Sequence, residues 1–221
     1  MAWLDMKITV VTPSIRPEGL KMTERTLKGQ TFKDFEWLNE LNTSGKVDFN
    51  QAMNRMLRKA NGELIVSLQD YIEINPDGLK NFWEAYQKNK KTVFTAPVAK
   101  NRGTIEWDWR IHKTDCDWQQ WEIDWGATPL SAIQEVGGFD ERLDEYWGFD
   151  NVNLGLRLNM AGYKVLCLPE NRAWAFDHDA HEEHPFRKLI NPDFHNQRLD
   201  EIRRGLKLNY LDNRGHSNKS T

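Results

Sequence analysis

The stretch MKITVVTPSIRPEGLKMTERTLKGQTFKDFEWLNEL, residues 6–41, contains a complete strand–helix–strand unit. Residues 6–13 form an apolar, β-branched run that ends at a proline, which is typical of a buried parallel strand. Residues 16–29 predict a helix with Pro17 near its start, and residues 35–41 predict a second strand. Two strands joined through a helix by short connections indicate a parallel βαβ unit.

The same alternation continues along the chain. Residues 50–61 predict a second helix that ends at Gly62, and residues 63–68 predict a third strand. A third helix over residues 76–88 and a fourth strand over residues 92–97 follow. We therefore expect an α/β fold with a mostly parallel central sheet flanked by helices, in which ligands bind beyond the carboxyl ends of the strands.

Composition excludes several classes of protein. A chain of 221 residues suits one large α/β domain, with or without an appendage. No run approaches the roughly 20 apolar residues of a membrane helix, and the first residues predict a strand and not a signal peptide. The net charge of −3 argues against a general nucleic-acid-binding surface. Cys116 and Cys167 form no spacing motif and favour a reducing compartment, so we expect a cytoplasmic protein.

A second informative stretch is VGGFDERLDEYWGFDNVNLGLRLNMAGYKV, residues 136–165. Gly137 and Gly138 can adopt backbone angles closed to other residues, so we expect a sharp turn there. Apolar residues then predict a helix that begins near Asn153 and ends at Gly162, before another strand. A carboxylate just before a helix N-terminus lies in a positive field, so the acidic loop is either a functional segment or a cap on a surface helix. Its carboxylates are Asp140, Glu141, Asp144, Glu145 and Asp150.

This ordered block resembles the acceptor-side motif of GT-A fold glycosyltransferases, which move a sugar from a nucleotide diphosphate onto an acceptor. The shared features are GGFDE, a WG pair, an acidic residue, L-x-x-R-L and a glycine before a strand. The family usually has Gly-Glu-Asp after WG, where this chain has Phe149, Asp150 and Asn151. The resemblance implies that Asp150 is the catalytic base and that Trp147, Gly148 and Asn151 contact the acceptor.

The N-terminal half resembles the same family. Residues 8–38 match its opening strand, its Thr-Pro and Arg-Pro pairs and a helix leading to Gln-Thr-x-x-x-Phe-Glu. Residues 49–70, FNQAMNRMLRKANGELIVSLQD, match its Ala-x-Asn-Arg helix, its Gly-Glu turn and the strand that delivers metal-binding acids. The resemblance implies UDP-sugar as the most suitable donor. The donor-binding residues that we expect are Thr12, Pro13, Ser14, Arg16, Glu40, Asn54 and Asp70, with Asn39 or Asn42 as alternatives to Glu40.

The resemblance also sets the expected domain boundaries, because it covers most of residues 6–180. Residues 1–185 are expected to form the GT-A domain, with a nucleotide-sugar-binding half over 1–100 and an acceptor-binding half over 101–185. Residues 186–221 are expected to form a helical extension and a flexible tail.

Asp70 is the candidate metal ligand. It ends an apolar strand, where a carboxylate can bind a divalent cation that neutralises a diphosphate. The family usually has Asp-x-Asp here, whereas this chain has QDY, with Glu73 as a substitute for the second acid. A strand-end Asp that caps a turn is the alternative. The resemblance implies that a histidine completes the shell of a Mn²⁺ or Mg²⁺ ion, with His178 the best placed and His181 the second.

Two further segments leave alternatives open. The run WAFDHDAHEEHPF, residues 174–186, combines imidazoles and carboxylates that suit a metallohydrolase, or it is a solvated loop. Trp125-Gly126 suits a close contact with an acceptor sugar, or it is a packing turn. The surrounding indoles either seal a small core or form a platform for a sugar ring. They belong to Trp107, Trp109, Trp118, Trp121 and Trp125.

The function that these patterns favour is metal-dependent, inverting transfer of a sugar from a nucleotide diphosphate to the hydroxyl of a glycan or another acceptor. Asp150 would take the proton of that hydroxyl. A non-catalytic protein that binds a nucleotide sugar or glycan is a second hypothesis, because the acidic motif around Asp70 is thinned. The metallohydrolase is the third.

Overall fold

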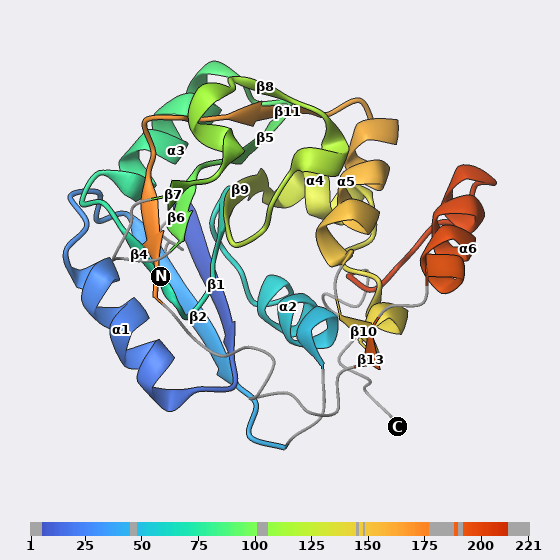
Figure 1. Cartoon of the computed structure of the whole chain (residues 1–221), viewed down its shortest axis with the longest axis horizontal. Coiled ribbons are helices and arrows are strands. Elements are labelled where there is room, and N and C mark those ends of the chain that lie inside the picture. Colours follow the sequence, from blue (N-terminus) through green and yellow to red (C-terminus); the bar gives the residue numbers. More distant parts are fainter. Residues whose placement is uncertain are drawn as a thin grey trace, which may run out of the picture.

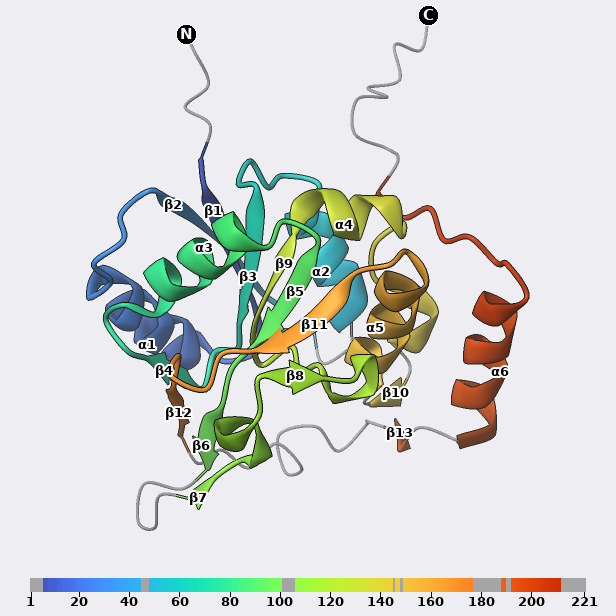
Figure 2. The ribbon, with the colours of Figure 1, turned by 90° about the horizontal axis from the view of Figure 1, so that it is seen from above.

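The computed structural model shows an α/β fold in which helices cover both faces of a central sheet (Figures 1 and 2). The described residues are 6–44, 48–100, 106–144, 146–147, 149–176, 188–189 and 192–211. The central sheet consists, in spatial order, of β2 (Phe35–Leu41), β1 (Ile8–Ser14), β3 (Leu64–Leu68), β9 (Trp125–Pro129), β5 (Thr92–Thr95), β11 (Lys164–Cys167) and β8 (Asp115–Cys116). Strands β9 and β8 run antiparallel to their neighbours and the others run in one direction, which confirms the predicted mostly parallel sheet.

Six α-helices and two smaller sheets complete the described part of the fold. The helices are α1 (Pro17–Lys28), α2 (Phe49–Leu57), α3 (Gly78–Lys88), α4 (Leu130–Glu135), α5 (Asp150–Met160) and α6 (Pro192–Arg203). A second sheet pairs β4 (Ile72–Ile74), β12 (Ala173–Ala175), β6 (Val98–Lys100) and β7 (Glu106–Trp107), and β10 (Tyr146–Trp147) pairs with β13 (Lys188–Leu189). Short 3₁₀ helices are η1 (Trp109–His112), η2 (Trp118–Gln120) and η3 (Glu141–Leu143).

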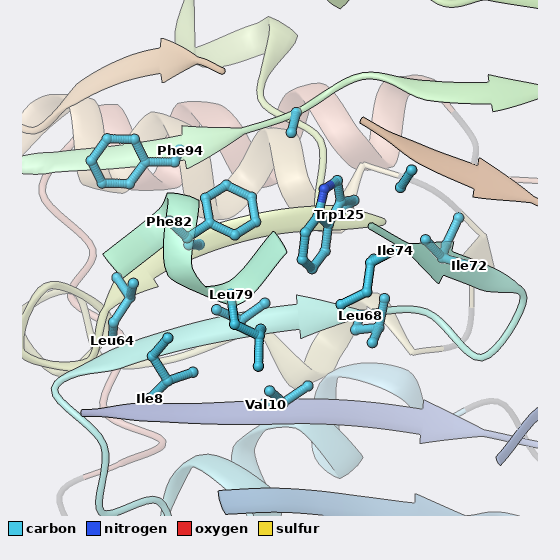
Figure 3. Close-up of a cluster of buried hydrophobic side chains, with 14 of the residues drawn as sticks. Ile8, Val10, Leu64, Leu68, Ile72, Ile74, Leu79, Phe82, Phe94 and Trp125 are labelled. Atoms are coloured by element: carbon cyan, nitrogen blue, oxygen red, sulfur yellow. The ribbon is translucent and has the colours of Figure 1, made fainter. Parts of the chain in front are cut away.

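The sheet separates two hydrophobic cores. Helices α1 and α3 pack on one face, and α2, α4 and α5 pack on the other (Figure 2). Figure 3 shows Trp125 of β9 beside Phe82 of α3, and the centroids of these two rings are 4.6 Å apart. Both side chains are fully buried, and burial of one large apolar side chain contributes roughly 1.5–3 kcal/mol. The long apolar strands of the sequence are therefore explained by burial on both faces.

Several predicted boundaries were wrong, and three of them have a clear physical reason. Strand β1 continues through Pro13 to Ser14, because its last pair with β3 is Val11 with Ser67 and the missing N–H of Pro13 costs no bond to that strand. Helix α2 ends at Leu57, well before Gly62. A Cβ atom on Gly62 would lie 2.3 Å from the amide nitrogen of Thr9, so close packing against β1 explains this glycine.

The third boundary is the start of α5, which begins at Asp150 and not near Asn153. The preceding Phe149 has a φ of 67°, the left-handed conformation, which lets the chain turn directly into the helix. Asp150 is therefore a first-turn residue of α5.

The double-glycine turn lies where the sequence predicts it. Gly137 and Gly138 have φ values of 80° and 87°. Arg157 of α5 donates hydrogen bonds to the carbonyl oxygens of Val136 and Gly138 at 2.7 and 2.5 Å, and burial lowers its pKa to about 10. The arginine of the L-x-x-R-L motif thus anchors this turn to α5.

Helix α6 packs against the outside of α5, at the edge of the molecule (Figure 2). Leu199 and Ile202 of α6 bury their side chains against Leu156 of α5, with Trp118 alongside. None of the helices that the structure describes is long and apolar enough to cross a membrane.

Candidate functional site

Ser14, Arg16 and Asp70 form a cluster at the carboxyl ends of β1 and β3. The Ser14 hydroxyl donates to Asp70 Oδ2 at 2.6 Å, and Arg16 Nε donates to the same oxygen at 3.1 Å. Arg16 Nη2 forms an ion pair with Asp70 Oδ1. The N-terminal turn of α1 closes over this cluster, since a Cβ atom on Gly19 would lie 2.6 Å from Asp70 Oδ2. Three of the residues predicted to bind the donor are therefore in direct contact.

The described residues do not by themselves fit a divalent cation. Both oxygens of Asp70 are engaged by Arg16 and Ser14, so a cation would have to bind next to the positively charged guanidinium group or displace it. Within the part of the chain that the structure describes, no three His, Cys, Asp or Glu side chains gather as a metal site would require. His178 and His181 lie outside the described residues. Asp70 is a partner of Arg16 in this structure.

Glu40 lies in a second charged cluster at the carboxyl end of β2. Arg55 of α2 donates from Nε to Glu40 Oε1 at 2.7 Å and from Nη2 to Asp48 Oδ2 at 2.6 Å. The hydrogen bond to Glu40 is the main reason that the pKa of Arg55 is raised. Asn42 donates to the other oxygen of Asp48. Arg55 is therefore held between two carboxylates, and the contact of Glu40 with a uridine stays a prediction.

The remaining donor-binding candidates lie inside the protein. Thr12 is fully buried, and its hydroxyl oxygen accepts a hydrogen bond from Trp37 Nε1 at 3.1 Å. Pro13 is buried within β1. Asn54 is also fully buried. Its Nδ2 donates to the Phe139 carbonyl oxygen at 2.9 Å, and its Oδ1 accepts from the Phe139 N–H at 2.8 Å. These bonds give Asn54 a structural role in joining α2 to the loop before α5.

Asp150 lies at the same edge of the sheet as the Ser14–Arg16–Asp70 cluster. Helix α2 follows β2, so its N-terminus lies at the carboxyl end of the parallel strands. Asn50, in the first turn of α2, donates from Nδ2 to Asp150 Oδ1 at 2.6 Å. Two distant parts of the sequence, the strand-end Asp70 and the helix-start Asp150, are thus brought to one edge.

Asp144 is a site residue whose role the sequence does not reveal. Its carboxylate is buried and accepts the backbone N–H groups of Asn50 and Gln51 at 2.6 and 3.0 Å. Burial raises its pKa, and these hydrogen bonds act in the opposite direction. Asp144 therefore caps α2, whose N-cap residue Asp48 makes no capping bond of its own. The signal in the sequence is a helix without a local cap beside an acidic loop.

Phe149 and His195 form an aromatic stack beside Asp150. Their ring centroids are 4.0 Å apart with an interplanar angle of 28°. Phe149 remains 39 % exposed, whereas His195 of α6 is buried and its Nδ1 has no hydrogen-bond partner within the described part of the chain. Burial lowers the pKa of His195. A backbone in the left-handed region costs a non-glycine residue about 1–3 kcal/mol, so this stack supports a strained residue next to the candidate base.

The predicted acceptor contacts lie in several environments. Asn151 donates from Nδ2 to the carbonyl oxygen of Trp121 at 2.8 Å. Trp125 is a core residue, and its indole N–H donates to the carbonyl of Asn171 at 2.8 Å. A Cβ atom on Gly126 would lie 2.8 Å from the carbonyl oxygen of Glu122, so close packing explains this glycine. For Trp147 the structure describes the backbone within β10, and Gly148 lies outside the described residues.

The tryptophan-rich segment is part of the core where its side chains are described. Trp121 and Trp125 are fully buried, and Trp118 packs at the junction of two hydrophobic clusters. The indole N–H of Trp121 donates to the carbonyl of Phe94 at 3.1 Å. Arg110 in this segment is buried and forms ion pairs with Asp108 and Asp124 at 2.6 and 2.9 Å. The indoles of Trp118, Trp121 and Trp125 therefore pack in the hydrophobic cores, which is the first of the two alternatives that the sequence left open.

The chain has a GT-A fold, which it shares with glycosyltransferases of known structure. Neither a protein-family model nor a curated protein matches the sequence. The similar solved structures include S. aureus TarS 1–349 in complex with UDP-GlcNAc, with a TM-score of 0.66 and 14 % identity over 89 % of this chain. The same fragment in complex with UDP gives a TM-score of 0.58 and 15 % identity over 89 % of this chain, and 70 % of the fragment is covered.

The chain is shorter than these neighbours. It spans 65 % of the TarS fragment bound to UDP-GlcNAc and 43 % of the longer TarS structure, which has a TM-score of 0.60 and 13 % identity. At this level of identity, the likeness establishes the fold, and the activity has to be argued from the site.

Proposed function

We propose that this chain is a glycosyltransferase that moves a sugar from a UDP-sugar to the hydroxyl group of an acceptor. The observation that carries the proposal is the arrangement at the carboxyl edge of the sheet. The Ser14–Arg16–Asp70 cluster lies at the ends of β1 and β3, and Asp150 lies at the same edge, at the start of α5. Ligands of open α/β sheets bind at this edge. Neighbours with the same fold hold UDP-GlcNAc or UDP.

In the proposed reaction, Asp150 acts as general base. It takes the proton of the acceptor hydroxyl as the oxygen attacks the anomeric carbon of the sugar, and the bond from that carbon to the diphosphate breaks. A single displacement of this kind inverts the anomeric configuration. Arg16 lies beside Asp70 with a fifth of its side chain exposed (21 %), where a guanidinium can interact with a diphosphate. The acceptor is a glycan or another molecule that carries a hydroxyl.

Metal dependence is a separate part of the proposal. A Mn²⁺ or Mg²⁺ ion on Asp70 and His178 would stabilise the departing diphosphate, but the described residues pair Asp70 with Arg16, so no step above uses a cation. The test is transfer in the presence of a chelator. Loss of transfer that Mn²⁺ or Mg²⁺ restores would support the metal site, and full activity in excess chelator would rule it out.

The occupied carboxylate of Asp70 also favours a second candidate, a protein that binds a nucleotide sugar without turning it over. The experiment that separates the two measures nucleotide release by the full chain from UDP-, GDP- and TDP-sugars, with and without a mixture of glycan acceptors. A transferase releases UDP faster when an acceptor is present. Binding of a UDP-sugar without any release would support the second candidate and contradict the first.

A further inference from the structure

Asn50 occupies an unusual position at the start of α2. Its side chain is buried, with 1 % exposed, and its amide nitrogen donates to two carboxylates. Nδ2 lies 2.9 Å from Asp144 Oδ1 and 2.6 Å from Asp150 Oδ1. Its amide oxygen Oδ1 is buried and has no hydrogen-bond partner among the residues that the structure describes. The residue thus uses only the donor end of its amide, and uses it to join two acids.

Asn54, one turn further along α2, shows what a structural amide looks like in the same helix. Its Nδ2 donates to the carbonyl of Phe139 at 2.9 Å and its Oδ1 accepts from the Phe139 N–H at 2.8 Å. Both ends of that amide are satisfied, as is usual for a buried polar group. Fold stability alone would favour the same outcome for Asn50, whose oxygen is instead left open.

Asp144 provides the fixed end of this link. Its two carboxylate oxygens accept the N–H groups of Asn50 and Gln51 at 2.6 and 3.0 Å, so the helix N-terminus holds it without help from the Asn50 side chain. The other charged groups near α2 have partners of their own. Arg55 forms ion pairs with Glu40 and Asp48, and Glu141 accepts a hydrogen bond from the side chain of Asn54. Among the described residues, Asp144 is therefore the charged group linked to Asp150 through Asn50.

We infer that Asn50 is a positioning residue of the candidate active site, whose amide group joins Asp144 to Asp150 and fixes the Asp150 carboxylate in one orientation. The inference rests on the proposed function, in which Asp150 accepts the proton of the acceptor. An N–H donor stabilises the ionised form of a carboxylate, and this form is the one that a general base needs. The same amide separates two carboxylates that would otherwise repel each other.

The test is a carboxyl ¹³C NMR titration of Asp150 in the full chain, with the resonance assigned by its loss in Asp150→Asn. Asn50→Ala should raise the apparent pKa of Asp150 by about one pH unit, as expected for the loss of one hydrogen bond to a charged group. Gln51→Ala is the matched control. It removes the neighbouring amide side chain, which also bonds Asp144, and should leave the titration of Asp150 unchanged.

A second variant covers the case in which Asn50→Ala does not fold. Asn50→Asp has nearly the same shape but replaces the donor with a carboxylate, and should raise the apparent pKa of Asp150 further than Asn50→Ala. An Asp150 titration that is the same in wild type, Asn50→Ala and Asn50→Asp would overturn the inference.

The activity measurement separates this inference from the proposed function. With UDP-GlcNAc as the probe, Asn50→Ala should lower kcat for UDP release about tenfold, leave KM unchanged and move the acidic limb of the pH profile upward. If the wild type released no nucleotide from any donor, the proposed function would fail, and the NMR titration would still decide the role of Asn50. A wild-type pH profile in Asn50→Ala would refute the positioning role.

Discussion

Asp150 is the residue on which the proposed chemistry depends. It lies in the first turn of α5 and accepts a hydrogen bond from Asn50. We expect Asp150→Asn to lower kcat by about 10²–10⁴-fold, the usual cost of removing a general base, because an amide cannot take the proton. Donor binding and thermal stability should remain close to wild type. Steady-state kinetics together with UDP binding would check this, and near wild-type turnover would move the search for the base to Asp140, Glu141 and Glu145.

The glycine turn before α5 offers a stability test at the residue scale. A Cβ atom on Gly137, where φ is 80°, would lie 1.8 Å from the carbonyl oxygen of Leu208. Gly205 has a φ of 98° but nothing within 4 Å of such an atom. We expect Gly205→Ala to cost about 1 kcal/mol of unfolding free energy from backbone strain, and Gly137→Ala to cost at least about 3 kcal/mol. Equal losses in urea denaturation would show that the clash is absent.

Helix α6 is linked to the candidate active site through the stack of His195 on Phe149. Burial lowers the pKa of His195 below its ordinary value of 6.5, so the unfolded chain binds this proton more readily than the folded one. Stability from His195 is therefore complete above pH 6.5 and is lost as the pH falls below it. His195→Gln removes the titrating group but keeps a polar side chain of similar size.

Hydrogen exchange of α6 at pH 7.5 and pH 5 should show this effect. The protection of α6 in the wild type should fall more steeply than in His195→Gln as the medium becomes acidic. An identical pH dependence in the two proteins would mean that the pKa of His195 is the same in the folded and unfolded states, and would contradict this prediction.

Local patterns were sufficient to predict most of the elements. The apolar runs and the periodic segments between residues 6 and 97 place β1, α1, β2, β3, α3 and β5 within a few residues. Strand β9 was not predicted, because WGATP is short, begins with a tryptophan and lies in a polar segment. Its place between β3 and β5 depends on burial of Trp125 against Phe82, a contact between residues far apart in the sequence.

The candidate site could be predicted only in part, because it too depends on contacts between residues far apart in the sequence. Asp70 and Asp150 stand out because each lies next to an element boundary, and both reach the carboxyl edge of the sheet. Asp144 and Asn50 are 94 positions apart, and neither carries a local motif that indicates their hydrogen bond. Trp125 and Gly126 resemble ligand contacts in the sequence, and the structure places them in packed surroundings.

At the scale of the whole molecule, the carboxyl edge of the sheet brings the Ser14–Arg16–Asp70 cluster and the candidate base Asp150 together on a GT-A fold. The account requires that this edge bind a nucleoside diphosphate, with Arg16 interacting with its phosphates. Arg16→Ala should therefore weaken UDP binding at least tenfold, since a charge-assisted hydrogen bond contributes roughly 1.5–3 kcal/mol. Asp150→Asn, at the acceptor end, should leave the affinity for UDP within about a factor of two of the wild-type value.

The most direct measurement is a calorimetric titration of UDP into the full chain and these two variants. We expect wild type and Asp150→Asn to bind UDP with similar affinity and Arg16→Ala to bind it at least about tenfold more weakly. A wild-type chain that does not bind UDP, or one whose affinity is unaffected by Arg16→Ala, would contradict the account.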